Sequence, residues 1–497
     1  MSSDRGPVED YLAQSTLHGV QYLDHTRHRV GRLFWVSVLF FCFAFVSYQI
    51  VELIQTFTRY PTVTKVSVRY PEEGLRMPNF TVCLQNRANK DRVEQLFPDV
   101  SMELLEYLSS SFLSAYSTAL YDADYFRHYT KRKQPQLQQD YEILLEKYNI
   151  SILEFFQRVS FQCTDVYHAC WFQNGNLFQC CNLARTFLSH NGPCFYFELD
   201  STFSQKLPGP VGGFGFMYWH PLLEMIPTGF NSYQERAVHL FLSPEDAILN
   251  QNPIAIRPGS HAHVSIQATR HVKVAHSYFQ QECSNNNNSL KLFPKLEYRY
   301  SRCQLECMVD TFESVCNCTG IDTYLGIEPW RFCSPSQGLE CFKKVALYLP
   351  EYLHRCRLTF CRESCVYWVY LPTISVGQLF HPHFEHQFAD QWHMQRRENI
   401  TDSLILVDYY FSEIKYVEIR ELYAITIETF VSNIGGALGL WTGASFITII
   451  HFVYYVIELV IFPGRMNFRR FQIGRFHTAT AETTYTAVLT QLNSGSS

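Results

Sequence analysis

Cysteine is the residue type with the most chemical potential in this chain, because a thiol can form a disulfide, bind a metal ion or act as a nucleophile. The 497 residues include 17 cysteines, and 16 of them lie between Cys83 and Cys365. The remaining one, Cys42, lies in an apolar stretch near the N-terminus. A cytosolic enzyme rarely carries so many thiols, so the count indicates an oxidising compartment or a set of metal sites.

Disulfides are the favoured interpretation of the ten cysteines that fall in the 83 residues from Cys283 to Cys365. Zinc is the alternative, since Cys316-x-Cys318 and Cys303-x3-Cys307 have the spacing of ligand pairs. The chain also carries five glycosylation sequons, which are typical of exported segments: Asn79, Asn149, Asn287, Asn317 and Asn399. We therefore expect up to eight disulfides and no metal site.

Four histidines that lie close together in the sequence are further candidates for metal binding or proton sensing: His381, His383, His386 and His393. A surface helix or loop that merely contains histidines is the favoured interpretation. The sequence has no GxSxG, HExxH or P-loop motif, so we expect neither an enzyme with catalytic residues nor a cofactor. With 47% hydrophobic and 18% charged residues, the chain is not wholly disordered, and a net charge of -5 does not suggest a nucleic-acid partner.

Two apolar runs near the ends of the chain predict transmembrane helices. Residues 33–53 have the length that a bilayer core of about 30 Å requires. Residues 423–462 form a second run, roughly twice as long as one straight membrane helix needs to be. Its polar residues and glycines fit either a helix-packing seam or a broken, pore-lining helix: Glu428, Asn433, Gly435, Gly436, Gly439, Gly443, His451 and Glu458.

Arginines flank both runs on the sides nearer the chain ends, which predicts cytoplasmic tails at residues 1–32 and 463–497. Residues 54–422 are then an extracellular, cysteine-rich domain of the α+β class, with an antiparallel sheet core and peripheral helices. Alternating patterns predict strands over Thr62–Tyr70, Asn79–Leu84, Cys194–Leu199 and His261–Val274. Helical periodicity and polarity predict helices over Val93–Tyr107, Gln139–Arg158 and Ser334–Tyr348, and a loop over Ser284–Ser289.

Over nearly its whole length the chain resembles the degenerin/epithelial sodium channel superfamily, the amiloride-sensitive sodium channels. The segment Ser15–Gly19 is similar to the family's His-Gly motif, and Met77–Cys83 to the strand after the first membrane helix. The cysteine pattern over Tyr300–Cys365 resembles the family's thumb, beside its palm and finger. Ile434–Ser445 resembles the pore signature, which is a specific match, and Cys170–Cys181 looks most like arthropod pickpocket sequences.

The resemblance implies a disulfide order for twelve of the cysteines. The implied pairs are Cys83 with Cys194, Cys283 with Cys365, Cys303 with Cys361, Cys307 with Cys356, Cys316 with Cys341, and Cys318 with Cys333. Four further cysteines form the remaining two pairs, in an order that stays open at this point: Cys163, Cys170, Cys180 and Cys181.

The same resemblance implies a trimeric channel in the plasma membrane, in which three two-helix subunits surround one pore. It places the selectivity filter at Gly443, Ala444 and Ser445 and gives gating roles to His18, Gly19 and Ser432. Further pore-lining positions are Asn433, Gly436, Gly439 and His451. Backbone carbonyls at an extended break would replace the water ligands of a permeant Na⁺ ion.

Two departures from the family pattern limit what the resemblance carries over. His451 stands where many relatives have a glutamate on the pore axis, which alters the expected conductance or divalent binding. The segment Phe279–Cys283 lacks the tryptophan that acid-sensing channels carry before this cysteine, so the resemblance alone does not safely carry their acid gating over to this chain.

The sequence therefore predicts a sodium-selective, amiloride-sensitive channel subunit that assembles as a homotrimer or with related subunits. A chemical or mechanical stimulus acting on its extracellular domain would open the pore. If the stimulus is a ligand, the sequence does not identify it. The alternative is a non-conducting, two-pass receptor or regulatory subunit of the same fold. An ATP-gated receptor is disfavoured by the cysteine pattern, and an ecto-enzyme by the lack of a catalytic site.

Overall fold

The computed structural model of this chain divides into two compact units, Met1–Thr62 with Tyr423–Ser497, and Val63–Leu422. We call them the helical unit and the sheet unit. The residues that the structure describes are 17–26, 28–112, 123–173, 175–189, 192–221, 224–226, 237–249, 252–274, 283, 290–292, 298–324, 331–342, 345, 351–352, 354–356, 361–379, 384–391 and 400–461.

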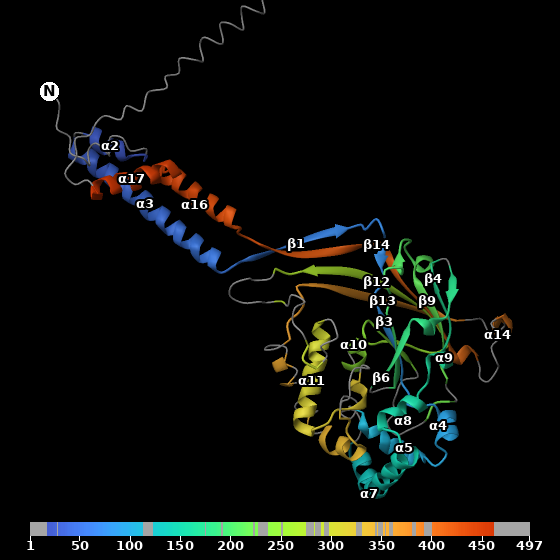
Figure 1. Ribbon diagram of the computed structural model, residues 1–497. Helices are drawn as coiled ribbons and strands as arrows, with labels where there is room; N and C mark the ends of the chain where they lie inside the picture. The colour runs from blue at the N-terminus through green and yellow to red at the C-terminus, as the bar shows by residue number, and fades with distance from the viewer. Residues whose placement is uncertain are drawn as a thin grey trace, which may run out of the picture. The chain divides into compact units, whose positions relative to one another are not determined.

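The helical unit contains α2 (Val20–His25), α3 (Arg29–Thr58), α16 (Ile427–Thr442) and α17 (Phe446–Ile461), which Figure 1 labels. α3 is apolar on all sides and about 45 Å long, which is ample to cross a bilayer core. Its side chains are mostly exposed, Phe40 to 75%, so water is an unfavourable environment for this helix. Residues 33–53 are thus the middle of a longer helix than the sequence predicts.

The second apolar run is broken, and its two helices meet at an angle of 76°. Each of these two helices has 16 residues and is too short to span a bilayer core alone. Taken together, the two described helices are long and apolar enough for one span. Of the two alternatives that the sequence leaves open for residues 423–462, the structure contains the break. α16 nevertheless also packs on α3, with the Phe430 ring 4.4 Å from Phe57 and the Trp441 ring 4.5 Å from Phe45.

The larger sheet of the sheet unit follows the order β13-β12-β14-β9-β4-β5, and β1 also pairs with β14. Its strands are β1 (Thr62–Arg69), β4 (Tyr167–Phe172), β5 (Asn176–Phe178), β9 (Phe214–Trp219), β12 (Ser260–Val272), β13 (Val366–Gln378) and β14 (Leu404–Tyr423). β12 and β14 run parallel, whereas β12–β13, β14–β9, β9–β4 and β4–β5 are antiparallel.

The predicted antiparallel sheet core is thus correct for most strand pairs but not for β12 and β14. A parallel pair needs a long crossover connection, and here that connection contains β13 and the helices between β12 and β14. The short-range alternation of the sequence locates β12 but carries no information about which distant strand lies beside it.

A second, five-stranded sheet has the order β11-β10-β3-β7-β6, and β2 (Leu75–Arg76) pairs with β8 (Ser204–Gln205). The strands of the second sheet are β3 (Phe80–Leu84), β6 (Ala184–Leu188), β7 (Pro193–Phe197), β10 (Val238–Phe241) and β11 (Ile254–Ile256). Aromatic rings join it to the larger sheet: Phe80 of β3 lies 5.8 Å from Phe216 of β9 and 5.3 Å from Tyr409 of β14. These rings belong to the main apolar core.

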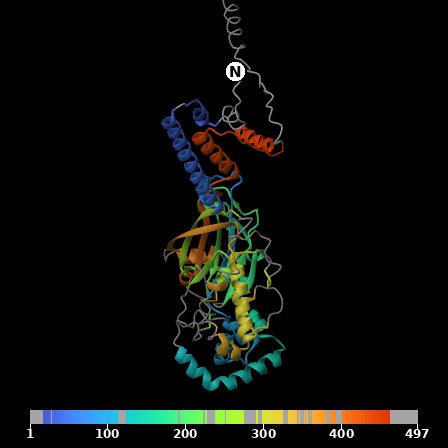
Figure 2. The same cartoon turned by 90° about the vertical axis from the view of Figure 1, so that its left-hand side faces the viewer.

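A helical cluster forms a second core from α4 (Lys90–Leu96), α5 (Met102–Leu108), α7 (Ala123–Tyr148) and α8 (Ile152–Val159). Figure 2 shows α7, in cyan, running across the end of the sheet unit. The sequence predicts one helix where α4 and α5 lie, and another where α7 and α8 meet. Pro98 disfavours helix at Phe97, and Asn149 has a φ of 46°, so each run is divided in two. Ser101 and Ser151 then cap α5 and α8.

The third part of the sheet unit is built on α11 (Tyr300–Cys316), which carries three half-cystines. The structure forms all six disulfides that the resemblance implies, and it joins the remaining four cysteines as Cys163–Cys181 and Cys170–Cys180. Cys42 alone is free. The predicted helix over Ser334–Tyr348 begins as α12 (Pro335–Gln337) and continues as a π-helix over Gly338–Phe342. Most of its remainder, and the predicted loop Ser284–Ser289, lie outside the described residues.

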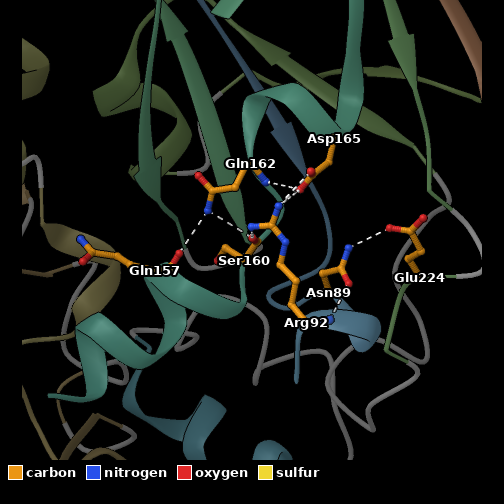
Figure 3. A network of polar contacts seen from close by, with 7 residues as sticks. All are labelled: Asn89, Arg92, Gln157, Ser160, Gln162, Asp165 and Glu224. Carbon is orange, nitrogen blue, oxygen red and sulfur yellow. Dashed lines mark hydrogen bonds and ion pairs between the residues drawn. The ribbon is translucent and has the colours of Figure 1, made fainter. Parts of the chain in front are cut away.

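A polar network joins α4 to the turn before β4 (Figure 3). The Arg92 guanidinium donates to both carboxylate oxygens of Asp165, at 2.9 and 2.8 Å, and to the Ser160 carbonyl at 3.2 Å. Asp165 also accepts from the backbone N–H of Gln162 at 2.7 Å. Both charged side chains are less than one third exposed, so their pairing is only partly screened by water.

Arg92→Met is expected to destabilise the folded chain by about 1.5–3 kcal/mol, because it leaves the partly buried Asp165 carboxylate without its charged donor. The measurement is the thermal unfolding midpoint of the purified full-length chain. Arg158→Met is the matched control, since Arg158 pairs with Glu154 on the surface and should contribute less than about 1 kcal/mol. Equal midpoints for the two variants would contradict the assigned role of the network.

Candidate functional site

The break between α16 and α17 follows from the three residues that form it. Gly443 ends α16 with a φ of 62°, in the left-handed region that glycine enters without a steric cost, and its N–H donates to the Gly439 carbonyl at 3.1 Å. Ser445 then begins α17: its Oγ accepts from the Thr448 N–H at 3.2 Å, while its own N–H donates to Thr448 Oγ1 at 3.1 Å. A C-cap of α16 at Gly443 and an N-cap of α17 at Ser445 thus flank Ala444.

The turn at His18 and Gly19 lies directly against this break. The His18 N–H donates to the Thr442 carbonyl at 3.0 Å. A Cβ added to Gly443 would come within 2.4 Å of the His18 ring atoms Cγ and Nδ1. Gly19 has a φ of 86° and begins α2, where a Cβ would lie 3.1 Å from Leu39. The structure therefore brings His18 and Gly19, two of the three predicted gating residues, against Gly443 of the predicted selectivity filter, and the roles themselves stay predictions.

The other predicted pore residues of α16 lie away from α3. Ser432 and Asn433 are exposed, and no atom of the described part of the chain lies within 4 Å of a Cβ built on Gly436 or Gly439. Phe430 and Trp441 contact α3, so α16 has an aromatic side that faces α3 and a side of small residues that faces away from it. His451 lies on α17, half-buried and outside the contacts described above.

A cavity of about 850 Å³ opens in the sheet unit. Aromatic side chains of β13, β14, α11 and the segment just before α11 form much of its wall: Tyr298, Tyr300, Tyr367, Trp368, Tyr370 and Tyr416. Burial raises the pKa of Tyr370 to about 12, against the opposing charges of Arg76 and Arg299, so this phenol is neutral at physiological pH. The volume lies in the range of small-molecule sites, and the wall combines these aromatic side chains with charged residues such as Arg76, Asp246, Arg299 and Glu363.

The remaining predicted sites stay predictions. Asn149 and Asn317 are exposed, whereas the Asn79 amide donates to Tyr196 Oη at 2.7 Å and accepts from the Leu199 N–H at 2.9 Å. Asn287 and Asn399 lie outside the described residues, as do His381, His383 and His393 and the side chain of His386.

The sequence analysis missed a different group, His261, His263 and Asp408, although the His-x-His spacing on a predicted strand places both rings on one face.

Comparison with known proteins identifies the class. The family described as "Amiloride-sensitive sodium channel" matches residues 11–455. The bile acid-sensitive ion channel of Homo sapiens is 25% identical over 485 residues, covering 90% of this chain and 85% of its own. Acid-sensing ion channel 1 of Gallus gallus is 21% identical over 472 residues, with coverages of 91% and 84%. A solved proton-activated chloride channel overlaps 86% of this chain and 97% of its own at 5% identity, with a TM-score of only 0.31.

These relatives are ion channels and not enzymes. The chain belongs to the amiloride-sensitive sodium channel family, within the degenerin/epithelial sodium channel superfamily. Members of this family are oligomeric channels of the plasma membrane. The similarity to the pickpocket branch stays a prediction from the sequence.

Proposed function

We propose that this chain is a subunit of a trimeric, sodium-selective and amiloride-sensitive cation channel, with α3 and the α16–α17 pair crossing the membrane and both tails in the cytoplasm. The observation that carries the proposal is the contact of the His18–Gly19 turn with the helix break at Gly443. A helix broken at this point is costly in lipid unless its free backbone groups meet a protein partner or line a water-filled path.

The break suits ion selection because it frees carbonyl oxygens in the middle of an apolar helix pair. A sodium ion that leaves water needs replacement oxygen ligands, and a ring of carbonyls from three copies would supply them. The small side chains at Gly443, Ala444 and Ser445 let three chains approach a common axis. The side of α16 with Ser432, Gly436 and Gly439 would then face the pore or the partner subunits.

Gating requires that a stimulus act differently on the closed and open states. The cavity at Trp368 and Tyr416 favours a chemical stimulus, since its wall offers both aromatic and charged side chains to a small molecule. β14 ends at Tyr423 and α16 begins at Ile427, so only a few residues of chain connect a strand that lines the cavity with the helix that carries the pore signature. The names of the relatives suggest bile acids and protons as the first molecules to test.

The deciding experiment records membrane current from cells that express the chain alone and together with related subunits. We expect a current that disappears when sodium is replaced by a large organic cation and that amiloride blocks, with surface labelling to show that the chain reaches the membrane. Acid and bile acids are applied in turn. A surface-expressed chain that yields no sodium-dependent current in any combination would reject the channel proposal.

A non-conducting regulatory subunit is the second candidate, and His451 in place of an acidic pore residue is the observation that favours it. In that case the chain alone gives no current but changes the current of a co-expressed relative. The current of the wild-type chain alone separates the two candidates, and His451→Glu then tests whether this position lies on an ion path, since only there should a new carboxylate restore or raise conduction.

A further inference from the structure

Three side chains with metal-binding atoms meet on the larger sheet of the sheet unit. His261 and His263 alternate along β12 with the buried Ala262 and Val264, so both imidazoles project from the face opposite the apolar core. The parallel register of β12 with β14 places His263 directly beside Asp408. The group thus depends on the parallel pairing of β12 with β14, which the sequence did not predict.

The distances are those of a compact three-ligand set. His261 Nε2 lies 2.7 Å from Asp408 Oδ2, and His263 Nδ1 lies 3.3 Å from the same oxygen. The two imidazole centroids are 4.3 Å apart, and the ligand atoms all lie within 4.8 Å of one another. Tetrahedral zinc with ligands at about 2.0–2.1 Å separates its ligand atoms by about 3.3 Å, a value that lies between the shortest separation here, 2.7 Å, and the upper limit of 4.8 Å.

One atom of the group is poorly satisfied by protein contacts alone. His263 Nδ1 is buried and forms no hydrogen bond with any described residue, since its approach to Asp408 has the wrong geometry. A buried polar atom left in this state is unfavourable, and His261 already occupies the shared carboxylate oxygen. A cation bound between the three side chains would give the lone pair of Nδ1 a partner.

The surroundings leave room for an ion with a water ligand. Gly377 of β13 lies opposite His261, and no described atom comes within 4 Å of a Cβ built there. The side chains of His261 and His263 keep about one third of their surface exposed, whereas that of Asp408 keeps 12%. A carboxylate held in place below two accessible imidazoles is open to an ion from one side.

We propose that His261, His263 and Asp408 form a binding site for a zinc-class transition-metal ion that links β12 to β14. Two imidazole nitrogens and one carboxylate oxygen are the ligand types of Zn²⁺, with a water in the fourth position. Ca²⁺ and Mg²⁺ take oxygen ligands and are disfavoured by the two nitrogens. The site does not depend on ion conduction, so it stands or falls separately from the proposed channel function.

The test is zinc binding by the purified full-length chain in detergent after treatment with a chelator. We expect isothermal titration to show a zinc site that Mg²⁺ does not fill, and Zn²⁺ to raise the thermal unfolding midpoint. His261→Gln, His263→Gln and Asp408→Asn should each weaken this site by at least about tenfold, because each removes one ligand. His271→Gln is the matched control, since His271 lies on β12 outside the group and stacks on Tyr367 at 4.8 Å.

Zinc binding that is unchanged in His263→Gln, or that is absent from the wild-type chain, would overturn the proposal. A spectroscopic measurement on the unmutated chain keeps the test independent of how well the variants fold. Cobalt added in place of zinc should show the visible absorption of a four-coordinate site, and zinc should remove it. A six-coordinate cobalt spectrum alone would also count against the site.

Discussion

Gly443→Ala is expected to reduce the sodium current per surface-expressed channel by roughly 5- to 30-fold. Gly443 has a φ of 62°, where a residue with a Cβ incurs a cost of about 1–2 kcal/mol. This cost lowers the population of the broken helix by about 5- to 30-fold. The new Cβ would also come within 2.4 Å of the His18 ring, so the imidazole must shift from its place against the break. Both effects act on the geometry that we propose selects the ion.

Gly435→Ala is the matched control for this experiment. It makes the same substitution in the same helix, at a glycine with helical backbone and no described atom within 4 Å of the added Cβ. Alanine favours the helix there by about 1 kcal/mol, so the fold of α16 is not at risk. The currents are normalised to surface labelling. If Gly443→Ala conducts like Gly435→Ala, the break at Gly443 does not shape the ion path.

The combined variant His18→Ala with Gly443→Ala separates the two causes. Removing the imidazole relieves the close approach to the new Cβ but leaves the backbone strain at residue 443. A double-mutant current above the product of the two single effects indicates that the His18 contact contributes, and this is the coupling that neighbouring residues show. Purely multiplicative effects assign the loss to the backbone of Gly443.

Much of the fold could be predicted from local patterns, because those patterns are set by burial. The alternation in His261–Val274 located β12 closely, since alternate side chains of this strand are buried. Thr62–Tyr70 located β1 by its sequence pattern alone, because seven of the eight residues of β1 are exposed. The helices were less accurate. The periodic run from Val93 to Tyr107 concealed a stop at Pro98 and a serine cap at Ser101, both of which were visible in the sequence.

The contacts that build the sites could not be predicted in the same way. The His18–Gly443 contact joins residues from opposite ends of the chain, and no local pattern encodes which turn meets which break. Asp408 meets His261 and His263 only because β12 and β14 are parallel neighbours, a pairing that a long connection makes possible. The resemblance supplied six disulfides, but Cys180 and Cys181 are adjacent, and only their positions in the fold decide which one reaches Cys170.

A bulky group on Ser432 is expected to raise the sodium current by roughly tenfold. Ser432 is exposed on α16, on the side away from Phe430 and its contact with α3. In the proposed trimer this side meets the pore or the neighbouring helices, where a small residue allows the closed state to pack. Overpacking costs about 1–3 kcal/mol, and 1.4 kcal/mol placed on the closed state alone raises the ratio of open to closed channels tenfold.

The sharpest form of this experiment adds the bulk after the channel has folded. Ser432→Cys keeps the side chain small, so its current should match the wild type until a bulky thiosulfonate reagent attaches to the new thiol. Cells expressing the wild-type chain control for modification of the free Cys42. Val431→Cys, at an exposed position one residue away on the helix, controls for bulk on a different side of α16. The proposal places only one side of the helix in the closing contact. The reagent should therefore raise the current of Ser432→Cys and leave the current of Val431→Cys unchanged. A reagent that leaves the Ser432→Cys current unchanged, with labelling of the thiol verified, would place the closing contact elsewhere.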